Sequence, residues 1–321
     1  MPSARSAARE SGSSPWWRNR VAIGIAVATI WFFGVLAIGA VGELTVPASR
    51  MLAIFGAAVA LWVSEAIPLA ATSIFVILAE ILLISDEALL SLPASFEPPT
   101  YDSIFATLAS PVLMLFLGGF VLADAAAKYG LDRNLAGVML RPFGTRPAAL
   151  LGGLMLITAL LSMFVSNTAT TAAMMAVVLP VAGSLDSDDR FRAALILAVP
   201  VAANIGGLGT PVGSPPNAIV LGRLDDQGLT VSFIKWMAFA VPIAIILLAL
   251  AWWLLVRRHP PSTESVSIRL GGAFDRSRFA VILYFAFGLT VIGWMTEPIH
   301  GVRSSIIGFA AVVLLLSLIH I

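Results

Sequence analysis

One stretch decides the fold of this chain: Asn204-Ile205-Gly206-Gly207-Leu208-Gly209-Thr210-Pro211-Val212-Gly213-Ser214-Pro215-Pro216-Asn217. It lies inside an apolar segment that runs from residue 191 to residue 222. Four glycines and three prolines within these 14 residues cannot continue a helix. Irregular backbone at membrane depth is tolerated only where protein buries it or where it lines a wet cavity. The stretch therefore predicts a broken transmembrane helix.

A second interruption lies upstream, in the apolar segment from residue 148 to residue 182. Its centre is Ser166-Asn167-Thr168, which divides the segment into arms of 18 and 14 residues. At 1.5 Å per residue the second arm would reach only about 21 Å, too short for a hydrocarbon core about 30 Å thick. We predict a re-entrant helical hairpin that enters from the cytoplasm and places its polar tip near the middle of the membrane.

The composition excludes a soluble enzyme. The chain has 321 residues, of which 59% are hydrophobic and only 12% are Asp, Glu, Lys or Arg, whereas a soluble domain carries about 25% charged residues. The net charge of +1 gives no indication of nucleic-acid binding. The chain has no cysteine, and its three histidines stand apart in the sequence, which excludes thiolate and histidine metal clusters. We expect an all-α polytopic membrane protein without enzymatic activity.

The distribution of charge predicts which loops are cytoplasmic, because Lys and Arg accumulate on that side. Residues 1–20 and 257–278 are rich in arginine and are expected inside, whereas residues 85–110 hold four acids and no basic residue and are expected outside. The hairpin must then start and end inside, and the N-terminus is cytoplasmic. The expected crossings of this multi-pass protein are residues 21–42, 51–63, 69–84, 111–127, 191–222, 233–256, 279–296 and 304–321.

The two interruptions hold three of the chain's five asparagines, Asn167, Asn204 and Asn217. A neutral amide inside an apolar segment is costly unless it is paired. Helix N-termini at the restarts would attract an anion. Carbonyls freed by the breaks, with the hydroxyls of Ser162 and Ser166, suit a hard cation such as Na⁺. No Lys or Arg lies in the middle of a predicted span, and no mid-depth carboxylate for proton coupling is evident. We expect the two interruptions to meet at one depth, and we infer an anion carrier coupled to Na⁺ through neutral oxygens.

At these residues the sequence resembles the divalent-anion/sodium symporter family, the sodium-coupled dicarboxylate, citrate and sulfate carriers. The resemblance rests on residues 166–171 (SNTATT) and 204–217, with support from residues 62–69 (WVSEAIPL) and 115–120 (LFLGGF), and runs from about residue 20 to the end of the chain. It implies a homodimeric carrier of the inner (plasma) membrane. A mobile transport domain would move substrate past a scaffold domain by an elevator-like displacement.

The resemblance also implies roles for individual residues. Asn167 and Thr168 would contact a substrate carboxylate, and the substrate site would be completed by Ser166, Thr210, Ser214 and Asn217. The residues implied for the Na⁺ site are Ser162, Ser166, Asn167, Asn204, Gly206 and Gly207.

The chain departs from the family pattern after residue 233. Family members carry an inverted second repeat with its own Ser-Asn-Thr tip and broken helix, and neither follows here. We interpret the chain as the first half of an inverted-repeat elevator-type transporter, which alone should not transport because such carriers place the site between both halves. The expected division is a cytoplasmic tail at 1–20, scaffold-type helices at 21–147, a transport-type region at 148–256, a cytoplasmic loop at 257–278 and the truncated start of a second repeat at 279–321.

The leading functional hypothesis is sodium-coupled uptake of a C4-dicarboxylate such as succinate, or of a similar divalent anion. The alternatives are a dicarboxylate or citrate antiporter without net sodium coupling, a sulfate carrier, and a non-transporting membrane subunit. The structural alternatives are that Ser166-Asn167-Thr168 only caps a buried helix and that the Gly/Pro stretch is only a packing kink. An intramembrane hydrolase is disfavoured because no Ser–His or Asp–Asp pair lies at mid-depth.

Overall fold

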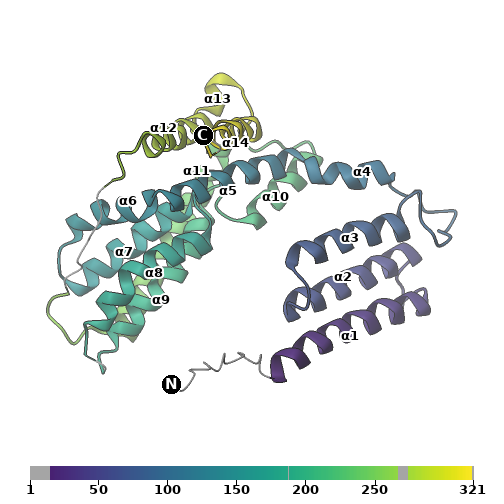
Figure 1. Ribbon diagram of the computed structural model, residues 1–321, viewed down its shortest axis with the longest axis horizontal. Helices are drawn as coiled ribbons and strands as arrows, with labels where there is room; N and C mark the ends of the chain where they lie inside the picture. Colours follow the sequence, from purple (N-terminus) through teal and green to yellow (C-terminus); the bar gives the residue numbers. More distant parts are fainter. Residues whose placement is uncertain (1–14, 187, 267–273, 320–321) are drawn as a thin grey trace, which may run out of the picture. The chain divides into compact units, whose positions relative to one another are not determined.

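The computed structural model is all-helical over the residues that it describes, 15–186, 188–266 and 274–319, and no strand occurs in these ranges (Figure 1). The chain forms two compact units, Met1–Ala109 and Ser110–Ile321, and each is described by itself. Residues 1–14 of the expected tail, residues 267–273 of the expected loop and the last two residues of the chain lie outside the described ranges. The prediction of an all-α membrane protein is confirmed.

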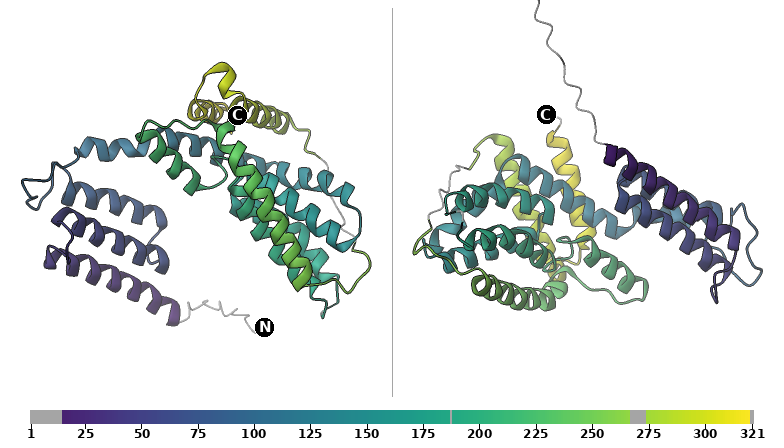
Figure 2. Two further views of the ribbon diagram at one scale, coloured as in Figure 1. Left: turned by 180° about the vertical axis from the view of Figure 1, so that it is seen from behind. Right: turned by 90° about the horizontal axis from the view of Figure 1, so that it is seen from below.

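Three helices lie side by side in the first unit (Figures 1 and 2). The middle helix, α2, packs against both of the others, because small and aliphatic side chains such as Ala57 and Ile54 line its two contact faces. A loop then leads to two short helices. The bounds are α1 (Pro15–Ile38), α2 (Val46–Ser64), α3 (Leu69–Ile84), α4 (Tyr101–Ala106) and the 3-10 helix η1 (Thr107–Ala109).

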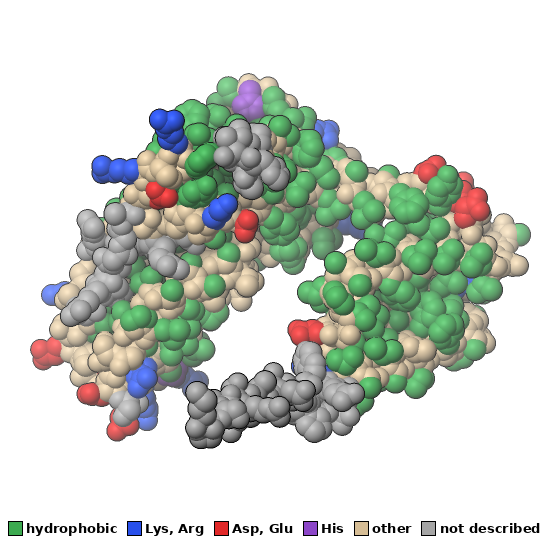
Figure 3. Space-filling view, in the orientation of Figure 1, with side chains coloured by type: hydrophobic (Ala, Val, Ile, Leu, Met, Phe, Trp, Pro, Cys, Tyr) green, Lys and Arg blue, Asp and Glu red, His purple; other side chains and the backbone are tan. Residues whose placement is uncertain are grey.

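The outside of this three-helix unit is also hydrophobic. The side chains of Ile30, Phe55 and Ile74 are 73%, 63% and 67% exposed, and hydrophobic side chains cover most of the visible face over α1–α3 (Figure 3). Soluble proteins rarely expose a continuous apolar surface of this kind to water. The unit therefore requires the hydrocarbon phase around it, as the composition predicts.

The turn between α2 and α3 is fixed by one strained residue. Glu65 takes the left-handed conformation with φ +50° and ends α2, where its backbone N–H donates to the carbonyl of Trp62 at 3.3 Å. Pro68 precedes α3 and has no N–H to extend a helix. The expected separation of the two apolar segments at residues 64–68 is present.

The second span begins earlier than the sequence predicts, and it includes Arg50. The hydropathy pattern starts that segment at residue 51, but α2 begins at Val46 and encloses Arg50, which is only 7% exposed. Its guanidinium donates to the carbonyls of Leu83 at 2.7 Å, Leu90 at 3.0 Å and Ser91 at 2.7 Å. These three bonds let the buried cation remain inside the unit, and they fix the loop that follows α3.

The second unit holds the remaining helices. Its helices have these bounds: α5 (Pro111–Lys128), α6 (Leu131–Leu140), η2 (Arg141–Phe143), α7 (Pro147–Ser162), α8 (Asn167–Gly183), α9 (Phe191–Gly207), α10 (Pro215–Asp226), α11 (Phe233–Arg258), α12 (Arg278–Met295), α13 (Glu297–His300) and α14 (Ser304–Ile319).

The largest core of this unit lies around α9. That helix packs against both α7 and α8, and α11 lies along α7 and α9 (Figure 2). Met155, Met174 and Leu195, one from each of the three inner helices, have no exposed surface. The expected helix–turn–helix at 148–182 is present, but its arms are 16 and 17 residues because the turn occupies only residues 163–166.

Helix α5 crosses α14 at a pair of glycines. A Cβ on Gly118 would lie 2.6 Å from the backbone of Gly308, so only glycine permits this separation. Helices α5 and α6 thus pack in the second unit, although the expected scaffold-type region runs from residue 21 to residue 147. The boundary between the two compact units lies at residue 109. The division into scaffold and transport regions concerns which part of the protein moves during transport, and it stays a prediction.

Five described helices are long and apolar enough to cross a membrane. They correspond to five of the expected crossings and have the bounds Arg20–Ile38, Val46–Ser64, Tyr101–Lys128, Phe233–Arg258 and Arg278–Met295. The other three expected crossings, at 69–84, 191–222 and 304–321, contain shorter apolar helices, which are Leu69–Ile84, Phe191–Gly207 and Ser304–Leu316 in the described part. A helix of 16 or 17 residues is only about 24–26 Å long, so length alone does not establish that these three cross.

Candidate functional site

The turn between α7 and α8 forms several backbone hydrogen bonds with the preceding helix. The N–H of Met163 donates to the carbonyl of Ala159 at 3.1 Å, and the N–H of Val165 donates to the carbonyl of Leu161 at 2.9 Å. Ser166 then caps α8, because its Oγ accepts from the N–H of Ala169 at 3.2 Å. The N–H groups of this turn are therefore paired with acceptors a few residues away.

The break between α9 and α10 covers residues 208–214 and is held by side chains from outside it. Asn217 donates from Nδ2 to the carbonyls of Gly207 and Thr210, both at 2.8 Å. Trp236 of α11 donates from Nε1 to the carbonyl of Leu208 at 3.0 Å. These donors replace the helical N–H groups that the break removes, and so the irregular backbone stays satisfied in an apolar surrounding.

Thr210 ties the break to the turn. Its hydroxyl donates to the carbonyl of Met163 and accepts from the N–H of Gly213 at 3.1 Å. Thr210 has no exposed surface. The two interruptions, 47 residues apart in the sequence, are thus directly bonded.

Asn167, the first residue of α8, is the centre of the cluster. Its side-chain amide lies 2.6 Å from the Oγ of Ser162 and 3.2 Å from the side-chain amide of Asn204. The amide atom nearest Ser162 also lies 3.2 Å from the carbonyl oxygens of Ala203 and Gly213. Because carbonyl oxygens can only accept, that atom is the NH₂ group, and three oxygens converge on it.

Two glycines allow α9 to approach these groups. A Cβ on Gly206 would lie 2.2 Å from the carbonyl oxygen of Ala159 in α7. A Cβ on Gly207 would lie 2.5 Å from the nearest atom of the Asn167 side-chain amide. Since real side chains do not approach this closely, glycine is required at both positions for α7, α8 and α9 to meet here.

The predicted residues divide into three groups by their place in the structure. Ser162, Asn167 and Asn204 form the polar cluster, and Gly206 and Gly207 pack beside it. Thr210 and Asn217 are buried and hold the break in shape rather than offering free polar groups. The predicted residues outside the direct contacts of Asn167 are Ser166, which caps α8, Thr168, which is exposed in the first turn of α8, and Ser214, which precedes α10.

Sequence reasoning missed several contributors. The carbonyls of Ala203 and Gly213 contact the Asn167 amide, but any residue type supplies a carbonyl, so no sequence signal identifies them. The indole of Trp236 comes from α11, and it reaches the break only because of the position in which α11 packs against it. Met163 lies within the turn, next to the quoted motif, and contributes only its carbonyl.

The cluster combines a buried floor with an accessible edge. Ser162 has no exposed surface, Asn167 is half-buried, and Asn204 and Thr168 are exposed. All of these groups are neutral, and no group of three or more His, Cys, Asp or Glu suited to a metal occurs among the described residues. The arrangement can bind a small cation through neutral oxygens, or a polar ligand through amide and hydroxyl donors, without a fixed charge.

Comparison with known proteins identifies similar sequences. Residues 59–321 match the family model described as citrate transporter. The sodium-dependent dicarboxylate transporter SdcS of Staphylococcus saprophyticus is 37% identical over 202 residues, which cover 60% of this chain and 36% of that protein. The SdcS proteins of Staphylococcus aureus strains USA300 and NCTC 8325 are 36% identical over the same length and coverage. The matched part is thus about a third of the length of these relatives.

Proposed function

The chain belongs to the citrate transporter family, and on this premise we propose that the whole protein carries a C4-dicarboxylate such as succinate across the inner membrane together with Na⁺. The family consists of transporters and not of enzymes, and the relatives named above are sodium-dependent dicarboxylate transporters. The resemblance seen at residues 166–171 and 204–217 is confirmed by the family match.

One observation carries the proposal: Asn167 brings the two interruptions together. Its amide contacts Ser162 of α7, Asn204 of α9 and the carbonyl of Gly213 in the break. A packing kink alone would not need an amide at this point, where burial makes a polar group costly. Discontinuous helices whose ends and unwound carbonyls converge are the way secondary transporters bind substrates and coupling ions near the membrane midplane.

The oxygen atoms around the Asn167 amide suit Na⁺ as the coupling ion. The hydroxyl of Ser162 and the carbonyls of Ala203 and Gly213 converge on one NH₂ group. A half-turn of the amide about its terminal bond would offer Oδ1 to the same place, so the residues that would hold Na⁺ are Ser162, Asn167, Ala203 and Gly213. The carbonyl of Gly207 is bonded to Asn217 and the Oγ of Ser166 to the N–H of Ala169, so these two oxygens are less available.

The anion would bind at the accessible edge of the same cluster. Asn204 and Thr168 are exposed there, and the N-terminus of α8 presents the positive end of a helix dipole. The start of α10 contributes less, since Pro215 and Pro216 have no N–H to donate. We infer that Asn167 and Thr168 contact a carboxylate and that Na⁺ beside it compensates the negative charge.

The lengths of α7 and α8 support the re-entrant hairpin. With 16 and 17 residues they are about 24 and 26 Å long, shorter than a hydrocarbon core of about 30 Å.

We propose that residues 148–256 form the transport region and move in an elevator-like manner past a scaffold at 21–147. We further propose that the protein is a homodimer with a cytoplasmic N-terminus.

The proposal is tested by replacing Asn167 with Ala in the whole protein, reconstituted in proteoliposomes. Sodium-stimulated uptake of radiolabelled succinate should be abolished, because the substitution removes the group that joins both interruptions. Asn134→Ala in α6 is the matched control, since Asn134 lies outside the cluster, and it should transport normally. Uptake by Asn167→Ala that still responds to sodium would contradict the proposal.

A binding measurement separates the ion site from transport. We expect Na⁺ to raise the melting temperature of the detergent-solubilised protein more than K⁺ does, and Ser162→Ala to abolish the difference. Ser73→Ala in α3, where the hydroxyl is exposed and bonded to the carbonyl of Leu69, should leave it intact. If Ser162→Ala melts with the same dependence on Na⁺ as the wild type, Ser162 is not an ion ligand.

A further inference from the structure

A groove runs along the outside of the α1–α2 pair. The two helices pack closely because Gly24 faces Ser64 and Gly56 faces the indole of Trp31, where an added Cβ would lie 2.2 Å and 1.9 Å from the nearest side-chain atoms. Beside this contact lies an open space of about 660 Å³. Its apolar walls are Ile23, Val27, Val59 and Val63.

Arg20 closes one end of this groove with a positive charge. It lies in the second turn of α1, and its Nη2 donates to the carbonyl of Val63 near the end of α2 at 3.0 Å. This bond fixes the guanidinium and uses one of its five N–H donors. Arg20 is exposed, and neither of the two ion pairs found in the described part of the chain involves it.

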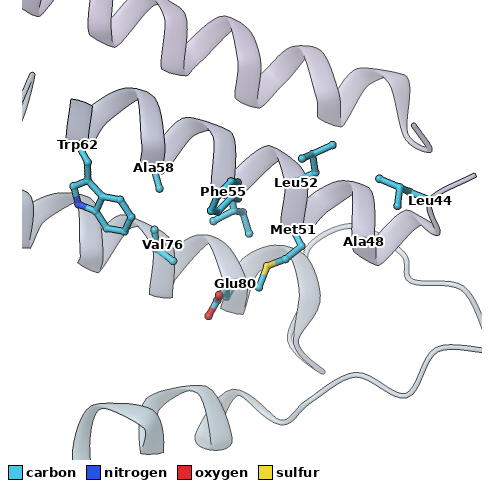
Figure 4. A pocket seen from close by; sticks show the side chains of 10 residues that line it. Leu44, Ala48, Met51, Leu52, Phe55, Ala58, Trp62, Val76 and Glu80 are labelled. Carbon is cyan, nitrogen blue, oxygen red and sulfur yellow. The ribbon is translucent and has the colours of Figure 1, made fainter. Parts of the chain in front are cut away.

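The neighbouring groove between α2 and α3 has the opposite character. It holds about 500 Å³ and is lined by apolar side chains such as Met51, Phe55 and Trp62, but its charged group is Glu80 (Figure 4). A carboxylate in that position repels phosphate, whereas the guanidinium of Arg20 binds phosphate in a planar, two-pronged manner. The same unit thus carries two grooves of similar size that differ in the sign of their charge.

We propose that the α1–α2 groove binds an anionic phospholipid, with an acyl chain between the valine walls and the phosphate at Arg20. The charge complementarity selects the headgroup, and the apolar walls match a hydrocarbon chain over the distance from residue 20 to residue 27, about 10 Å along α1. A basic group at the end of an apolar groove between membrane helices is the arrangement that recognises anionic lipid headgroups. This site is separate from the Asn167 cluster and does not depend on transport.

Native mass spectrometry of the delipidated whole protein tests the proposal by titration with phosphatidylglycerol and, separately, phosphatidylcholine. We expect tighter binding of phosphatidylglycerol, and a loss of about fivefold in its affinity with Arg20→Gln, the effect of one basic group near an anionic surface. Arg20→Lys should retain most of the preference because it keeps the charge. Val59→Trp should reduce binding of both lipids, because it fills the groove without touching the α1–α2 contact.

Glu80→Gln is the matched control and should leave the preference unchanged. The proposal is overturned if Arg20→Gln keeps the full preference for phosphatidylglycerol. It is also overturned if glycerol 3-phosphate binds as tightly as the lipid, since the site would then take a free phosphate. If Val59→Trp changes the oligomeric state and leaves lipid binding intact, the groove is a contact between copies of the chain instead.

Discussion

The two interruptions in the second unit are built differently. The turn at residues 163–166 pairs its backbone with the preceding helix and ends in a serine cap. The break at residues 208–214 depends on Thr210, Asn217 and Trp236, of which Trp236 comes from a different helix and Thr210 bonds the turn. The N–H groups of the turn thus have local partners, whereas the break also needs a donor from α11.

This difference separates two kinds of residue near the site. Groups that hold the break, such as Asn217, are buried and fully engaged, and their loss should reduce stability. Groups that face the accessible edge, such as Asn204 and Thr168, are exposed and should matter more for binding than for folding. Substitutions that compare the turn with the break therefore test which of the two interruptions depends on long-range contacts.

The largest effect is expected from Gly206→Ala. The new methyl group would lie 2.2 Å from the carbonyl oxygen of Ala159, so α9 must move away from α7 and the break loses its register. We expect a loss of about 3 kcal/mol of stability or more, measured as a large fall in the melting temperature in detergent and as loss of sodium-stimulated uptake.

Gly288→Ala is the control for Gly206→Ala. Gly288 lies inside α12 and has open space where its Cβ would be, so the substitution should be neutral or slightly stabilising through helix propensity. If Gly206→Ala melts like Gly288→Ala, the break does not require the close approach of α9 to α7.

A smaller but still large effect is expected from Asn217→Leu. The substitution leaves the carbonyls of Gly207 and Thr210 buried without the amide that now bonds both at 2.8 Å. Each unsatisfied buried group costs about 1–3 kcal/mol, so the total loss should be about 2–6 kcal/mol. Thermal or denaturant unfolding in detergent measures it.

Gln227→Leu on the exposed end of the same helix is the matched control and should change stability by less than about 0.5 kcal/mol. A wild-type melting curve for Asn217→Leu would show that water or another group satisfies the two carbonyls. The break would then not depend on its side-chain donors.

The sequence was sufficient to predict that the two interruptions meet, and the reason is chemical. Asn167, Asn204 and Asn217 lie in otherwise apolar segments, and buried amides must find partners. The structure supplies those partners, and the side-chain amides of Asn167 and Asn204 lie 3.2 Å apart. The match to the citrate transporter family confirms the resemblance that these residues carry, whereas the substrate and the re-entrant course of the hairpin stay predictions.

The sequence could not reveal contacts whose partners are set only by packing. Hydropathy places Arg50 at the edge of a span because it treats a charge as a boundary, yet one carbonyl in the last turn of α3 and two in the loop after it satisfy the guanidinium inside the unit. The indole of Trp236 reaches the break only because α11 packs at one particular register. Helix ends were also approximate, since α8 starts at Asn167 immediately after its cap.

The smallest effect is expected from Ser166→Ala, which removes the cap of α8. The Oγ of Ser166 accepts from the N–H of Ala169 at 3.2 Å, and losing an N-cap costs about 1 kcal/mol. The turn itself should persist because the N–H groups of Met163, Phe164 and Val165 keep their backbone acceptors and Thr210 still donates to the carbonyl of Met163. Ser166→Thr keeps a capping hydroxyl and should recover most of the stability in the same melting assay. A loss as large as that of Asn217→Leu would mean that the turn, like the break, relies on distant contacts, and a loss of sodium-stimulated uptake without a loss of stability would place the Ser166 hydroxyl among the ion ligands.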